Sequence, residues 1–169
     1  MIEFSIKHIQ ANSPYDITLV ENKFVFCTDF GIRYVASFDE EDIVFGGCKT
    51  YQFILQNVEH AHAPHDPKIE ATVLAIIDEF FRSNRHVLLY ICDTSDGKES
   101  GRNRLFLRWF ERHAAPNRFT ICTANAQVED EIVYVAIIVD NRNPHLQSIT
   151  EDFKTAAEVL TNKPADTEV

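Results

Sequence analysis

The sequence predicts an α+β protein with a mixed, mainly antiparallel sheet and the element order ββββ-α-β-α-ββ-α. Three observations support this. First, hydrophobic residues make up 45% of 169 residues, enough for a sizeable core. Second, the first third of the chain alternates strand-like segments with turn residues. Third, the apolar period changes near Asp66 from that of a strand to that of a helix.

Four strands are expected in the first third, because its segments are rich in aromatic and β-branched residues. They cover residues 15–20, 23–28, 32–38 and 50–58, with turn signals at Asn22, Gly31 and Gly46-Gly47. In the fourth segment, apolar Tyr51 and Phe53 alternate with polar Gln52. This alternation is typical of a strand with one buried face.

The first predicted helix runs from Asp66 to about Arg85. Its apolar residues recur at helical spacing: Ile69, Val73, Ile76, Ile77 and Phe80. Asp66 is a natural N-cap, since a carboxylate accepts hydrogen bonds from the free amides of the first turn. Pro67 suits the first helical position, where a missing N–H costs nothing.

The remaining elements follow in alternation. Residues 87–92 are apolar throughout, as expected of a central strand, and the strand–helix–strand order implies at least one parallel pair. A second helix is predicted over 99–113, strands over 119–123 and 132–139, and a last helix over 149–160, with Ser148 and Glu151 at capping-box spacing. We therefore expect one α+β domain over residues 1–162 and a flexible polar tail over 163–169.

Composition narrows the class of protein. A net charge of −10 argues against general nucleic-acid binding and against an anionic membrane surface. No apolar run is long enough to span a bilayer, and the first residues do not have the pattern of a secretion signal, so we expect a cytoplasmic protein. The four cysteines are isolated, and the three within strand-like runs, Cys27, Cys92 and Cys122, are expected to be small buried residues.

The stretch "VEHAHAPHDPK" places His60, His62 and His65 within six positions. Imidazoles at this spacing could hold zinc or nickel, so a divalent metal at these three residues is one hypothesis. The alternative is a strand-to-helix joint capped by Asp66 and Pro67. In that case the histidines would line the wall of a pocket.

A second candidate site lies between Leu88 and His113, where a predicted strand ends at Asp93 and a loop carries Asp96 and Gly97. Arg104 begins an exposed arginine stripe on the following helix, whereas Arg102 falls on its inward side and needs a partner, because an unpaired buried charge is costly. Three interpretations remain open. Asp93 or Asp96 pairs with Arg102, the loop binds an anionic ligand, or the two aspartates hold magnesium.

Two resemblances bear on the fold. From Thr50 onward, the order of elements is similar to the second half of the acetyl-CoA-dependent N-acetyltransferase fold. In that family the loop matching "HAHAPHDPKI" is rich in glycine and binds the cofactor pyrophosphate, but here it contains no glycine. The combination of "YQFILQN", "DPKIEATVLAIIDEFF" and "LLYICDTSDGKESGRNRLFLRWF" also resembles an uncharacterised family of short bacterial proteins, classified only as a domain of unknown function, and the likeness spans most of the chain. Its most specific part rests on Tyr90, Cys92, Asp93, Asp96, Gly97, Arg104, Phe106, Trp109 and Phe110.

Two functions are therefore carried forward. The first is a small cytoplasmic binding or interaction module without catalysis or cofactor, since no complete catalytic motif is present. The alternative is an enzyme or sensor that binds an anionic small molecule, such as an acyl-CoA or a nucleotide, through Asp93, Asp96, Gly97, Arg102, Arg104 and His65. For either function, we expect the binding partner to be a small anionic molecule or a protein. A homodimer would pair the acidic run Asp39–Asp42 with the arginine stripe of a second copy.

Overall fold

The computed structural model describes residues 2–59, 61, 64–83, 85–93, 108, 110–112, 117–128 and 131–161. The chain divides into two compact units. Unit 1 consists of Met1–Asp39 and Gln52–Asn84, and unit 2 consists of Glu40–Tyr51 and Arg85–Val169. Each unit therefore combines segments from two parts of the sequence.

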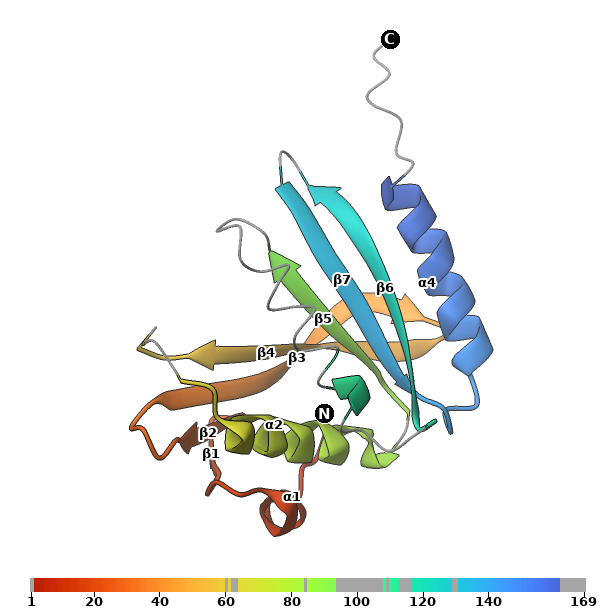
Figure 1. The fold of residues 1–169 in the computed structure, drawn as a ribbon. Coiled ribbons are helices and arrows are strands. Elements are labelled where there is room, and N and C mark those ends of the chain that lie inside the picture. The colour runs from red at the N-terminus through yellow and green to blue at the C-terminus, as the bar shows by residue number, and fades with distance from the viewer. Residues whose placement is uncertain are drawn as a thin grey trace. The chain divides into compact units, whose positions relative to one another are not determined.

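The fold is α+β, as the sequence predicts. Its elements in chain order are α1 (Ile6–Asn12), β1 (Thr18–Val20), β2 (Lys23–Cys27), β3 (Arg33–Phe45), β4 (Cys48–Asn57), α2 (Pro67–Phe80), η1 (Phe81–Ser83), β5 (Val87–Asp93), β6 (Phe119–Val128), β7 (Glu131–Asp140) and α4 (Leu146–Thr161). The sheet is mixed and mostly antiparallel, in the strand order β1-β2-β3-β4-β5-β7-β6 (Figure 1).

Unit 1 is built around aromatic side chains. β1, β2 and the first residues of β3 form an antiparallel meander in which Phe24 lies opposite Ala36 and Leu19. The Phe38 ring stacks on Phe80 of α2 with centroids 4.8 Å apart. α1 packs against α2 (Figure 1). Aromatic rings packed in this way bury a large apolar area per residue.

Helix α2 begins as the sequence predicts. Asp66 is its N-cap and Pro67 occupies the first turn. The predicted apolar stripe faces inward: Val73, Ile76, Ile77 and Phe80 are buried, and Ile69 is half-buried. The helix ends at Phe80, where the chain tightens into the short turn η1.

Unit 2 contains an antiparallel β5-β7-β6 array. Leu89 lies opposite Ile137, and Ile137 lies opposite Cys122 on the far side. α4 lies along β6 (Figure 1) and contributes Ile149 and Phe153 to the apolar cluster. That cluster comprises Phe45, Cys48, Val87, Leu89, Ile137, Val139, Ile149 and Phe153.

Four local predictions were wrong. The short helix α1 was missed, because only Ile9 of its seven residues is buried and its sequence carries little apolar period. β3 extends to Phe45, beyond the predicted strand over 32–38, so the acidic run Asp39–Asp42 lies within the strand. α4 begins at Leu146, before the predicted capping box. Cys27 is exposed rather than buried.

The second predicted helix, over 99–113, falls mostly outside the described residues. Arg108 and Phe110–Arg112 are helical, and Phe110 is fully buried against Phe119. The predicted tail, 163–169, also lies outside the described residues, and the prediction of one domain over 1–162 stays a prediction.

Candidate functional site at the amino end of α2

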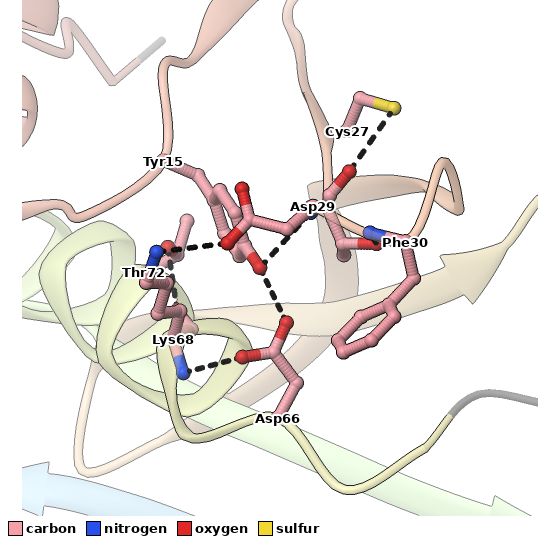
Figure 2. A network of polar contacts seen from close by, with 8 residues as sticks. Tyr15, Cys27, Asp29, Phe30, Asp66, Lys68 and Thr72 are labelled. Atoms are coloured by element: carbon pink, nitrogen blue, oxygen red, sulfur yellow. Dashed lines mark hydrogen bonds and ion pairs between the residues drawn. The ribbon is translucent and has the colours of Figure 1, made fainter.

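The best-defined polar cluster of unit 1 is centred on the buried N-cap of α2 (Figure 2). Asp66 is 8% exposed and uses both carboxylate oxygens. Oδ1 accepts a hydrogen bond from the Lys68 amide at 2.9 Å, and Oδ2 accepts one from the hydroxyl of Tyr15. Since Tyr15 is only 6% exposed, this second bond closes inside the protein, where an unmade bond would be costly.

The same tyrosine hydroxyl also holds the turn between β2 and β3. It accepts a hydrogen bond from the Asp29 amide at 3.2 Å. The Asp29 side chain reaches α2, where Lys68 Nζ lies 2.8 Å from Asp29 Oδ2 and 5.6 Å from the centroid of the Tyr15 ring (Figure 2). The turn and the amino end of α2 are thereby fixed to one another.

The turn from Thr28 to Ile32 is held by four hydrogen bonds of its own. Thr28 Oγ1 accepts from the amides of Phe30 and Ile32, both at 3.2 Å. The Thr28 amide donates to Ile32 O at 2.9 Å, and the Gly31 amide donates to Thr28 O at 3.0 Å. Gly31 has φ +78°, which side-chain-bearing residues rarely adopt. This frame leaves Phe30 60% exposed.

A stack of three aromatic rings links Tyr15 to Asn57, the last residue of β4. Tyr15 stacks on Phe26 with centroids 6.0 Å apart, and Phe26 stacks on Tyr34 at 5.5 Å. The Tyr34 side chain hydrogen-bonds Asn57, whose amide makes two bonds to the backbone of Ala61. The connection is therefore anchored at one end by Asn57 and at the other by Asp66.

The titration of these groups limits what they can do chemically. Burial raises the pKa of Tyr15, and its bond to Asp66 adds to that effect. Burial also raises the pKa of Tyr34, reinforced by the charge of Asp66. The hydrogen bond to Asp29 raises the pKa of Lys68. At neutral pH both tyrosines are therefore protonated and the lysine is charged, so none of the three is activated as a base or nucleophile.

Only part of the predicted site falls within the described residues. His65 is exposed and immediately precedes Asp66. Asp93 is the last residue of β5 and lies opposite Val133, but its side chain is outside the described residues. The other predicted residues also lie outside them: His60, His62, Asp96, Gly97, Arg102 and Arg104.

The predicted metal site rests on three histidines, of which the structure describes one. Within the described ranges, no three His, Cys, Asp or Glu side chains lie close enough together to hold a metal ion. A metal at His60, His62 and His65 therefore stays a prediction. A magnesium ion at Asp93 and Asp96 also stays a prediction.

Four residues of this cluster were not found from the sequence: Tyr15, Asp29, Phe30 and Lys68. Their contacts join segments far apart in the chain, and no spacing rule reveals such pairs. Gly31 was the one local signal, because it marks a turn. It gave no indication that the turn is fixed to the start of a helix.

Together, the fold and the site define an α+β protein in which a capped helix start braces an exposed aromatic turn. The chain belongs to the DUF6169 family of unknown function, whose model matches residues 65–155. The match begins just before the N-cap Asp66 and includes α2, β5, β6 and β7. No curated protein and no solved structure matches the chain. Among the described residues, no helix combines the length and apolar character needed to cross a bilayer.

Proposed function

We propose that this protein is a small bacterial, cytoplasmic binding module without catalysis, which recognises a protein partner through the turn that carries Phe30. The proposal includes an acetyltransferase-like arrangement of the last two-thirds of the chain, used without acetyl-CoA. Cys27, Cys48 and Cys122 are unbridged, which is consistent with a reducing compartment.

The exposed Phe30 ring is the observation that carries the proposal. Aromatic anchors contribute much of the binding energy at protein interfaces, and binding is stronger when the anchor is already held in place. The hydrogen bonds of Thr28 and the Lys68–Asp29 ion pair hold this turn before any partner arrives. Val58, 42% exposed, comes just after β4, donates its amide to Arg33 O at the start of β3 and adds apolar surface there.

The amino end of α2 supports the absence of acetyl-CoA chemistry. In an acetyltransferase-like arrangement, the cofactor pyrophosphate would occupy the free amides of this helix start. Here the Asp66 carboxylate already accepts from the Lys68 amide. A phosphate placed there would have to displace a buried negative charge that Tyr15 also holds in position.

The test uses a photo-reactive phenylalanine analogue in place of Phe30 in the full chain, followed by irradiation in cells. We expect one discrete protein adduct. The control carries the same analogue at Val159, an apolar residue of α4 that is 65% exposed, and should give no such adduct. Equal cross-linking at both positions would show nonspecific stickiness and would reject the Phe30 surface.

A matched pair of variants tests whether the turn must be braced. Lys68→Ala removes the ion pair to Asp29 but leaves Phe30 in place, so we expect the adduct yield to fall severalfold. Lys49→Ala removes an exposed ion pair in unit 2 and should not change it. The absence of catalysis is tested separately by calorimetry with acetyl-CoA and an assay of acyl transfer to amines. Binding together with turnover would overturn the proposal.

A further inference from the structure

We propose a second binding surface in unit 2: the outer segment of β3, Glu40–Phe45, pairs with an extended basic segment of a partner protein as an added strand. This surface is distinct from the Phe30 turn and goes beyond the function proposed above. Pairing of this kind takes its affinity from main-chain hydrogen bonds and its specificity from alternate side chains.

The outer segment has a free edge. The β2–β3 register ends at Ala36, which lies opposite Phe24, so no described strand pairs with Glu40–Phe45 on that side. Within unit 2 the strand order is β3-β4-β5-β7-β6, which makes β3 an edge strand of that unit. An edge strand presents backbone N–H and C=O groups that another strand can use.

The side chains of this edge do not fully shield it from pairing with another strand. Proteins normally shield exposed edges with charge, and Glu41 and Asp42 would do so. They are followed, however, by two apolar residues in succession, Ile43 at 49% exposure and Val44 at 56%. Because successive residues of a strand point to opposite faces, apolar surface is exposed on both faces of the strand.

The negative charge of the segment favours a basic partner. The segment begins with three acidic residues, Glu40, Glu41 and Asp42, and Glu40 pairs with Lys49 of β4 at 3.2 Å. Among the described residues, Glu41 and Asp42 have no ion-pair partner. A strand laid along this edge would bring its own side chains within reach of these carboxylates. Lysine or arginine would be favoured there and acidic residues rejected.

The probe is a labelled peptide of about seven residues that alternates lysine and valine, with binding followed by fluorescence anisotropy. We expect binding at moderate salt and none for the glutamate–valine counterpart. A lysine–valine peptide with a central proline keeps most of the charge but loses a main-chain donor. It should bind at least about ten-fold more weakly. Equal binding of the proline peptide would show simple charge attraction and would overturn strand addition.

Three further measurements locate the surface. Hydrogen exchange of the full chain should slow at the amides of 40–45 when the peptide is bound, and unchanged exchange there would overturn the proposal. The double variant Glu41→Lys, Asp42→Lys should abolish binding, whereas the same charge change at the exposed Asp16 and Glu21 should not. Phe30→Ala should leave peptide affinity unchanged, which separates this surface from the Phe30 turn.

The last control is the oligomeric state of the protein in the absence of peptide. If it sediments as a dimer that Val44→Lys dissociates, the edge is occupied by a second copy, and the proposal of a basic partner fails. A monomer that binds the lysine–valine peptide supports it.

Discussion

The Tyr15 hydroxyl donates a hydrogen bond to the carboxylate of Asp66, joining two buried residues 51 positions apart in the chain. Through this bond the segment before β1 holds the first turn of α2. The same hydroxyl accepts from the Asp29 amide, so one side chain connects three segments of unit 1.

Tyr15→Phe is therefore expected to destabilise the protein. The change leaves Asp66 Oδ2 and the Asp29 amide without their partner, at a cost of about 1 to 3 kcal/mol in the free energy of unfolding. Urea denaturation measures it. Tyr34→Phe is the matched control, because Tyr34 is less buried and Asn57 keeps its bonds to Ala61. A larger loss in the control would contradict the central position assigned to Tyr15.

The two glycines of the β3–β4 turn give a second test. Gly46 has φ +57°, and a Cβ there would lie 2.8 Å from Ile149 Cγ1 and from the Ile149 amide nitrogen of α4. Gly47 has φ +75° but open space around it. Gly47→Ala should cost about 1 kcal/mol from backbone strain alone, and Gly46→Ala roughly 2 to 4 kcal/mol. Equal melting temperatures for the two variants would contradict the close approach of Ile149.

The buried Glu79 should hold α1 in place. Its carboxylate accepts from the Ser5 amide at 3.0 Å, from His8 Nδ1 at 2.6 Å and from Arg82 Nε at 3.0 Å. Glu79→Gln removes the charge that strengthens these bonds, so we expect a loss of about 1 to 3 kcal/mol. We also expect faster proteolysis before Ser13. Glu70→Gln makes the same change of charge in the first turn of α2 and should leave the N-terminal segment protected.

We expect His86 to make the free energy of unfolding depend on pH. Burial lowers the pKa of His86, and the nearby Lys49 lowers it further. The unfolded chain therefore binds this proton more readily, and the free energy of unfolding should fall as pH drops from about 7 to about 5. His86→Phe keeps an aromatic ring beside Tyr51, 5.2 Å away, and should reduce this slope. An unchanged slope in urea titrations at several pH values would exclude His86 as its source.

The alternative function makes a prediction for Arg102, which lies outside the described residues. If the loop from Asp93 to Arg102 binds an anion, inorganic phosphate or an acyl-CoA should raise the melting temperature of the native protein. Arg102→Ala should remove that shift without changing the melting temperature of the free protein. A variant that fails to fold would instead favour an ion pair between Arg102 and Asp93 or Asp96.

The start of α2 and its buried face could be predicted from the sequence alone. Asp66 and Pro67 define the start of α2, and the apolar stripe from Val73 to Phe80 defines its buried face. Both depend on residues a few positions apart, within reach of the helical period and the capping rules. The α+β class followed from the same local periods.

Where the strands end and which side chains meet was decided only by the tertiary structure. β3 continues through the acidic run to Phe45, because pairing with its neighbour overrides the polar character of that run. The bonds of Tyr15 to Asp66 and of Lys68 to Asp29 likewise form between segments that only the folded chain brings together. Sequence patterns encode periods within one element, whereas a site of this kind depends on distances between elements. Those distances are fixed by packing.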